Sequence, residues 1–138
     1  MKTAIYYLSK AGSTKTIAEA IATELNIVAK PISDYQDEKV DILFVGGSLK
    51  ANGIDGKLKN FLTSLNSNSI GKIVVFGTSA TGEPLLPAIK RFLGDSNLVV
   101  DEDNFICKGK FLFTNGGRPN EEDRKNAKIF ASSVINMQ

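Results

Sequence analysis

The strongest constraint on the fold is a regular alternation of two kinds of segment along the chain. Short apolar runs, which are too short for helices and rich in Val, Ile, Phe or Tyr, predict strands that are buried on both faces. Between and after most of them lie segments whose apolar residues recur with a helical period. The expected strands are Ala4–Leu8, Ile27–Ala29, Ile42–Val45, Ile73–Phe76, Leu98–Val100, Phe105–Cys107 and Phe111–Phe113, and the expected helices are Thr14–Leu25, Ile54–Leu65, Leu85–Leu93 and Asn120–Val134.

This alternation is typical of α/β proteins, in which a parallel sheet carries helices on both faces. We therefore expect a doubly wound parallel sheet of about five strands. The length of 138 residues suits a single domain over residues 1–138. The stretch Ile106–Asn120 is the longest without a helical period, and its two apolar runs predict a broken or hairpin-like last strand. The acids of Asp101–Asp103 are expected to be loop charges.

Composition excludes several kinds of chemistry. The chain has no histidine, which removes catalytic Ser-His-Asp and Cys-His arrangements and every histidine-ligated metal site. Its one cysteine, Cys107, lies in an apolar run and is expected to be an inert core thiol. The 17 basic and 15 acidic residues give a net charge of +2, and the lysines are scattered along the sequence, so a nucleic-acid partner is not expected.

The first residues of the chain bear on its location. The apolar run Ala4–Leu8 ends where Ser9 and Lys10 follow. A secretory signal or a membrane span needs a longer apolar run than this. We therefore expect a cytoplasmic protein that does not enter a membrane.

The turn between the first expected strand and the first expected helix, Ser9–Thr14, has the composition of an anion-binding loop. It is rich in hydroxyl groups, contains Gly12 and opens directly onto the helix. A helix N-terminus carries unpaired N–H groups and a partial positive charge, so anions bind there. The last helix begins with three acids, as the helix dipole favours, whereas the first helix has no acid before Glu19. A bound phosphate would supply the missing negative charge.

The loop alone leaves a second interpretation open, in which Ser13 or Thr14 is simply an N-cap and the neighbouring lysines are solvated. Two other phosphate motifs are excluded. The nucleotide P-loop requires a glycine where Thr14 precedes Lys15, and the dinucleotide fingerprint requires three glycines where this loop has one.

The loop and the order of the elements together resemble the flavodoxin family. The family's phosphate loop, [TS]-x-T-G-x-T, is matched by Ser9, Gly12 and Thr14 at its first, fourth and sixth places. At the third place Ala11 replaces the usual hydroxyl residue. The resemblance covers essentially the whole chain. It implies a flavodoxin-like, five-stranded parallel sheet in the order 2-1-3-4-5, with helices on both faces.

The resemblance also implies a non-covalently bound FMN at the carboxyl edge of the sheet. One loop is expected to hold the phosphate, a second to cover one face and edge of the flavin ring, and a third to line the other side. Many flavodoxins stack the ring between Trp and Tyr, but this chain has no Trp, and its three tyrosines lie outside these loops. In chain order the expected cofactor-binding residues are Ser9, Lys10, Ala11, Gly12, Ser13, Thr14, Ser48, Leu49, Lys50, Ala51, Asn52, Gly53, Thr78, Ser79, Ala80, Thr81 and Gly82.

The function implied by the resemblance is electron transfer by FMN between two redox partner proteins, a reductase and an acceptor enzyme, with the carrier a monomer or weak dimer. Two alternatives stay open. One is an FMN-dependent oxidoreductase acting on a small molecule such as a quinone, porphyrinogen or tetrapyrrole, which an uncovered flavin face would suit. The other is a non-redox domain with a degenerate phosphate loop. The chain has no long insertion that would build a substrate pocket, which favours the carrier.

Overall fold

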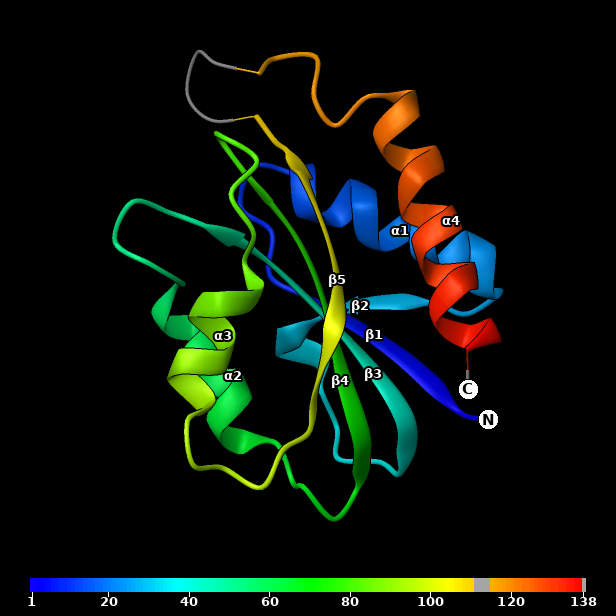
Figure 1. Ribbon diagram of the computed structural model, residues 1–138, viewed down its shortest axis with the longest axis vertical. Helices are drawn as coiled ribbons and strands as arrows, with labels where there is room; N and C mark the ends of the chain where they lie inside the picture. The colour runs from blue at the N-terminus through cyan, green and yellow to red at the C-terminus, as the bar shows by residue number, and fades with distance from the viewer. Residues whose placement is uncertain (111–114, 138) are drawn as a thin grey trace.

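The computed structural model describes residues 1–110 and 115–137, and it contains a five-stranded sheet in the order β2-β1-β3-β4-β5 (Figure 1). Every neighbouring pair of strands is parallel, which confirms the expected doubly wound topology. The strands are β1 (Thr3–Tyr7), β2 (Ala29–Pro31), β3 (Val40–Leu49), β4 (Ile70–Ser79) and β5 (Val100–Lys108).

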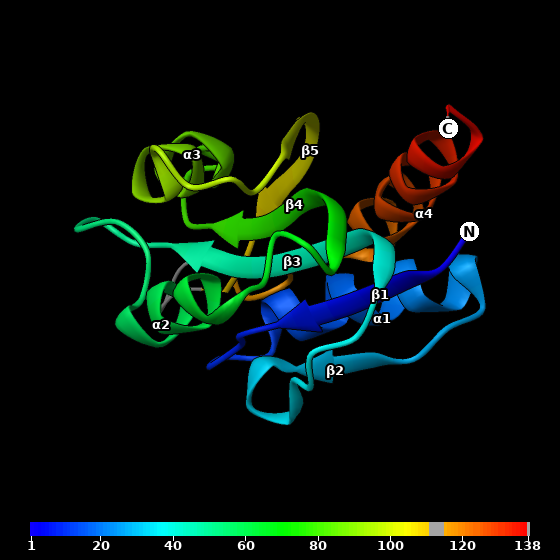
Figure 2. The ribbon, with the colours of Figure 1, turned by 90° about the horizontal axis from the view of Figure 1, so that it is seen from below.

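Four helices cover the two faces of this sheet, α1 and α4 on one face and α2 and α3 on the other (Figures 1 and 2). Alternate residues of each central strand face opposite sides. Phe44 therefore packs in the core beneath α1 and α4, and its neighbour Leu43 packs in the core beneath α2 and α3. The helices are α1 (Ser13–Leu25), α2 (Gly56–Ser64), α3 (Leu86–Leu93) and α4 (Glu121–Asn136), and a short 3-10 turn (Ile32–Asp34) follows β2.

The helix boundaries follow from their capping residues. Helix α2 begins at Gly56 and not at Ile54, because the Asp55 carboxylate accepts a hydrogen bond from the backbone N–H of Lys57 (2.8 Å) and so acts as its N-cap. Helix α4 begins with a capping box between Asn120 and Asp123. These polar caps place the starts of the helices at the residues where orphan N–H groups find acceptors.

The last strand differs from the expectation. Leu98–Val100 and Phe105–Cys107 were expected as separate strands, but one continuous strand, β5, runs from Val100 to Lys108. The acids of Asp101–Asp103 lie in this strand and not in a loop. They are tolerated because β5 is at the edge of the sheet, and Asp101 pairs with Lys72 of β4 (2.7 Å).

The expectation that every strand is buried on both faces is wrong for the two edge strands, β2 and β5. All three residues of β2 are partly or fully exposed, and among the residues of β5 Cys107 alone is buried. Burial, assisted by the negative charge of Asp123, raises the pKa of the Cys107 thiol to about 12, which agrees with an inert core thiol. The expected strand Phe111–Phe113 lies outside the described residues.

The close approach of β3 and β4 near their carboxyl ends depends on glycine. Gly47 and Gly77 are partners in the register, and a Cβ on Gly77 would lie 2.5 Å from the carbonyl oxygen of Gly47. We therefore expect Gly77→Ala to lower the free energy of unfolding by about 1–3 kcal/mol, measured by urea denaturation. Gly56→Ala is the matched control, because a Cβ at Gly56 meets nothing within 4 Å. Equal stability of the two variants would contradict this description of the sheet.

Candidate functional site

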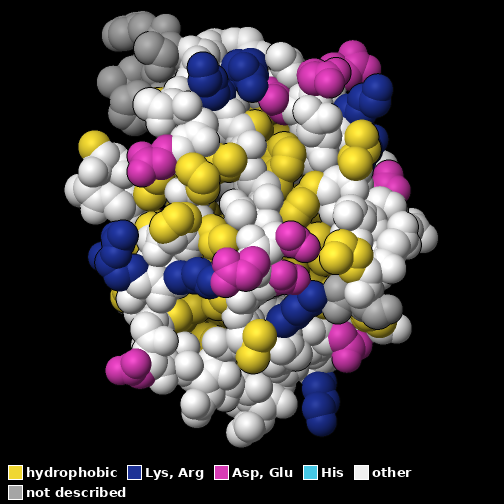
Figure 3. Space-filling model, viewed as in Figure 1, with side chains coloured by type: hydrophobic (Ala, Val, Ile, Leu, Met, Phe, Trp, Pro, Cys, Tyr) yellow, Lys and Arg dark blue, Asp and Glu magenta, His cyan; other side chains and the backbone are white. Residues whose placement is uncertain are grey.

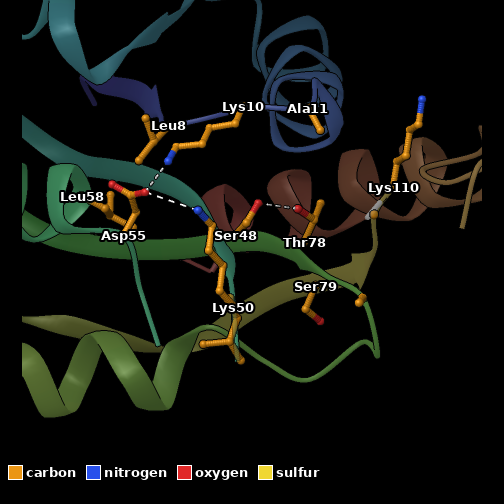
Figure 4. Close-up of a pocket in the computed structure, with 13 residues that line it drawn as sticks. Leu8, Lys10, Ala11, Ser48, Lys50, Asp55, Leu58, Thr78, Ser79 and Lys110 are labelled. Carbon is orange, nitrogen blue, oxygen red and sulfur yellow. Dashed lines mark hydrogen bonds and ion pairs between the residues drawn. The ribbon is translucent and has the colours of Figure 1, made fainter. Parts of the chain in front are cut away.

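The loops that follow β1, β3, β4 and β5 meet at the carboxyl edge of the sheet and enclose a cavity of about 270 Å³ (Figure 4). A doubly wound sheet binds ligands at this edge, where the strand order reverses. Here the reversal falls between β1 and β3. The cavity is lined by Leu8, Lys10, Ala11, Ser48, Leu49, Lys50, Asp55, Leu58, Thr78, Ser79, Ala80, Gly109 and Lys110.

The loop before α1 presents backbone donors to this edge. Gly12 has a φ of 93°, a left-handed conformation that favours glycine, and its N–H donates to Ser9 Oγ (3.1 Å). The first intrahelical hydrogen bond runs from the N–H of Thr16 to the carbonyl of Gly12, so the N–H groups of Ser13 and Thr14 have no acceptor within the helix. The first turn contains no acid, so these donors and the helix dipole are available to an anion.

Three hydroxyl groups join this loop to the sheet. Thr14 Oγ1 lies 3.0 Å from Ser48 Oγ and 2.9 Å from Thr78 Oγ1, and the last two are 3.0 Å apart. The triangle connects the first turn of α1 to the ends of β3 and β4. A ring of three hydroxyls can satisfy each donor within the ring, so it holds the three elements together without a charged group.

The hydroxyl positions overturn the interpretation of Ser13 or Thr14 as the N-cap of α1. The N-cap is Gly12, which has no side chain to serve as an acceptor. Thr14 is buried in the hydroxyl triangle, and Ser13 Oγ accepts a hydrogen bond from the backbone N–H of Lys110 (2.9 Å). Both hydroxyls therefore link the helix start to other elements and leave its backbone N–H groups uncapped.

Two lysines from different loops share one carboxylate at the cavity wall. Lys10 Nζ lies 2.8 Å and Lys50 Nζ 3.3 Å from Asp55 Oδ2, and Figure 4 shows both ammonium groups directed at it. The hydrogen bond from Lys10, and after it that from the Lys57 amide, holds the pKa of Asp55 well below its ordinary value. The same contact raises the pKa of Lys10. Lys10 is therefore ion-paired, not simply solvated.

A second hollow, of about 390 Å³, continues from the cavity between the loops after β3 and β4. Four residues line both spaces, so the two form one extended cleft; they are Leu49, Lys50, Ser79 and Ala80. The second hollow is also lined by Ala51, Gly53, Thr81, Glu83, Pro84, Pro87, Ala88 and Arg91.

Most of the sequence-predicted site residues lie in this cleft. The first cavity is lined by the expected residues Lys10, Ala11, Ser48, Leu49, Lys50, Thr78, Ser79 and Ala80, and the second hollow adds Ala51, Gly53 and Thr81. Six expected residues line neither space: Ser9, Gly12, Ser13, Thr14, Asn52 and Gly82. Of these, Gly12, Ser13 and Thr14 form the helix start beside Ala11, and Ser9 lines another hollow beside α2.

The structure adds wall residues that the sequence reasoning missed, above all from the loop after β5. Gly109 packs so closely that a Cβ there would lie 2.9 Å from the Cβ atoms of both Ser13 and Thr78. Its N–H donates to the carbonyl of Ser79 (3.0 Å). The sequence contains a feature that could have identified this loop, because Gly109 and Lys110 directly follow the last strand. The other added wall residues are Leu8, Asp55, Leu58 and Lys110 in the first cavity and Glu83, Pro84, Pro87, Ala88 and Arg91 in the second hollow.

The chemistry of the cleft is that of a binding site for an anionic ligand with an apolar part. Aromatic side chains are absent from the described residues that line the two spaces. Residues 1–110 and 115–137 hold no group of three or more Cys, Asp or Glu side chains that could bind a metal ion. Within the same residues, no helix is long and apolar enough to cross a membrane.

A doubly wound sheet of this order, with an anion-accepting loop after β1 and a cleft at its carboxyl edge, defines the flavodoxin-like class of α/β proteins. The profile of the family described as "Flavodoxin domain" matches residues 4–114. The chain belongs to this family. A search of curated proteins finds no match.

Solved structures agree with the fold over the whole chain. A flavodoxin from the domain Archaea superposes with a TM-score of 0.79 at 19% identity, covering 99% of this chain and 98% of that one. Oxidised Flavodoxin 2 from Bacillus cereus superposes with a TM-score of 0.71 at 18% identity, with 100% of both chains covered. A short-chain flavodoxin associated with a non-canonical PDU bacterial microcompartment gives 0.74 at 16% identity, with 99% of both chains covered. At these identities the likeness shows the fold.

The shared carboxylate gives a pH-dependent prediction. Asp55→Asn keeps an N-cap acceptor but loses the charge that pairs with the two lysines. We expect the variant to be only slightly less stable at pH 7, because Lys10 is largely exposed and solvent screens the ion pair. Asp55 has a lowered pKa in the folded chain, so its contribution is fully present well above the ordinary value of 3.8 and declines as the pH falls below it.

Urea denaturation of both proteins at pH 7 and near pH 3 measures this difference. The difference in the free energy of unfolding between wild type and Asp55→Asn should be smaller at the lower pH. A difference that stays constant or widens on acidification would show that the Asp55 carboxylate is not stabilised by its lysine partners.

Proposed function

We propose that this protein binds one FMN non-covalently in the cleft and serves as an electron carrier between a reductase and an acceptor. The observation that carries the proposal is the start of α1, where uncapped N–H groups, an acid-free first turn and the left-handed Gly12 stand beside the cleft. A Cβ built on Gly12 meets nothing within 4 Å, so the space above the loop is free for a ligand. Membership of the flavodoxin family supports FMN as that ligand.

The phosphate side of the site fits a dianion. Ser13 and Thr14 would contribute backbone N–H groups, because their hydroxyls are engaged with Lys110 and with the hydroxyl triangle. Lys10 lies in the same loop and pairs with Asp55. A phosphate would offer Lys10 a second anionic partner and would compensate for the hydroxyl that Ala11 lacks.

The ring side of the site fits a flat apolar group with polar edges. Leu49, the last residue of β3, and Ala80, which directly follows β4, line both spaces of the cleft, as does Lys50. FMN would supply the redox chemistry, since it exchanges electrons singly or in pairs. The chain's own part is to bind the phosphate, to orient the ring between the two loops and to set the charge around it.

The construction of the cleft favours a carrier over an enzyme with its own substrate. Its walls are the ends of β3 and β4, the loops at this edge of the sheet and residues of α2 and α3, and the chain has no long insertion that would add a substrate pocket. One observation favours the oxidoreductase alternative. The described residues that line the second hollow include no aromatic ring and several small side chains, which leaves room beside the flavin ring for a small molecule. Rapid oxidation of the reduced protein by a quinone, without a protein acceptor, would support that alternative.

The proposal predicts selective binding of FMN by the phosphate loop. Titration of flavin fluorescence with the flavin-free protein should show saturable quenching, and riboflavin should bind at least about tenfold more weakly, a difference of about 1.4 kcal/mol. Gly12→Val should abolish the preference for FMN, because its side chain fills the space above the loop and a branched residue is strained at a φ of 93°.

Two control variants distinguish the loss of ligand space at Gly12 from backbone strain as causes of weaker FMN binding. Gly12→Asn tolerates the left-handed conformation but still fills the space, so it should weaken FMN binding with little loss of stability. Gly56→Ala, in the first turn of α2, should bind FMN as the wild type does. Equal affinity for FMN and riboflavin in the wild type would refute the phosphate role of the loop, and absence of binding at high micromolar protein would refute the function.

The position of Lys50 predicts an electrochemical effect. Its positive charge at the cleft favours a negatively charged reduced flavin, so Lys50→Glu should shift the midpoint potential for full reduction to a more negative value. Lys125→Glu, which changes the charge of α4 by the same amount, should leave the potential nearly unchanged. Spectroelectrochemical titration of the three proteins measures this. An unchanged or more positive potential for Lys50→Glu would mean that Lys50 does not face the flavin.

A further inference from the structure

Positive charge is concentrated around the mouth of the cleft. Lys10, Lys50 and Lys110 line the first cavity and Arg91 lines the second. Lys108 borders the loop after β4, since its Cγ lies 3.9 Å from the position of a Cβ built on Gly82.

The acids there are Asp55 and Glu83, so the mouth carries five positive and two negative charges, a net +3. The whole chain carries +2, and all its other residues together therefore carry −1. The mouth of the cleft is thus more basic than the nearly neutral chain as a whole.

Three of these cations are available to a partner. Lys10 and Lys50 are paired with Asp55. Arg91, Lys108 and Lys110 are exposed, and within the part of the chain that the structure describes they form no ion pair. Figure 3 shows basic side chains grouped at the upper end of the molecule, where β5 ends in Figure 1.

The centre of this surface is apolar. Between the cations lie small side chains of the second hollow, and Ala51, Pro84 and Pro87 are exposed there. A small apolar centre inside a charged rim is the arrangement of a protein–protein interface, in which the rim selects the partner and the centre is desolvated.

We infer that this basic rim, formed by Arg91, Lys108 and Lys110 around the cleft mouth, docks an acidic surface of a redox partner protein. The inference rests on the proposed function, because the same cleft would hold the flavin whose electrons the partner exchanges. Single-stranded nucleic acid is the other polyanion that such lysines attract. It is disfavoured because its bases stack on aromatic side chains, and those are absent from the described residues that line the cleft.

The test is binding to two redox proteins of opposite surface charge. The probes are a [2Fe–2S] ferredoxin with a strongly acidic surface and a c-type cytochrome with a basic surface, both oxidised. Each is titrated by calorimetry into the protein with and without FMN, at about 20 mM and about 200 mM salt. The ferredoxin should bind, and its Kd should rise at least about tenfold at the higher salt, whereas the cytochrome should not bind.

Charge-reversal variants locate the surface. The double variant Lys108→Glu/Lys110→Glu should raise the Kd for the ferredoxin at least about tenfold at low salt. It should still fold, because the bond from Lys110 to Ser13 uses the backbone N–H. Lys125→Glu, on exposed α4, should change the Kd less than about twofold, and circular dichroism confirms folding of both variants.

The outcomes separate this inference from the proposed function. If FMN binds but the ferredoxin does not, or if the double variant binds it as the wild type does, the docking surface is refuted and the flavin site stands. If FMN does not bind while the ferredoxin binds in a manner that depends on Lys108 and Lys110, the proposed function fails and the surface stands. Tighter binding of a thymidine oligonucleotide than of the ferredoxin would overturn the choice of an acidic protein.

Discussion

A triangle of hydroxyl groups on Thr14, Ser48 and Thr78 holds the candidate site together. These residues come from the first turn of α1 and from the ends of β3 and β4, so the triangle fixes where the phosphate loop stands relative to the two central strands. The close packing of the Gly47–Gly77 pair allows those strands to meet there, and Gly109 brings the loop after β5 against the same point. The cleft is the space that these neutral contacts leave between four loops.

Much of the fold follows from the sequence because burial imposes a pattern on it. The central strands β1, β3 and β4 are covered by helices on both faces, and their continuous apolar runs identify them. The edge strand β5 does not follow this pattern. Acids occupy Asp101–Asp103 because one side of the strand is open to solvent, and Lys72 pairs with Asp101. The strand order and the flavin site came from resemblance to a family, and the family match and the sheet topology confirm the order.

The fine structure of the site could not be predicted, because it depends on side chains far apart in sequence. A hydroxyl in the loop before α1 is an N-cap candidate by local rules, yet Thr14 and Ser13 bond to groups 34 to 97 residues away. Asp55 follows local rules as the cap of α2, but its pairing with Lys10 depends on the register of β1 and β3. Local patterns identified the loops, and tertiary contacts decide what each side chain does there.

The most direct test of the central claim is residue-resolved: two-dimensional amide NMR of the flavin-free protein titrated with FMN and, separately, with riboflavin. Both ligands should shift the amide signals of Leu49, Lys50 and Ala80, and FMN alone should strongly shift those of Ser13 and Thr14. The same shifts at the helix start with riboflavin, or FMN-induced shifts confined to residues outside the cleft, would contradict the central claim.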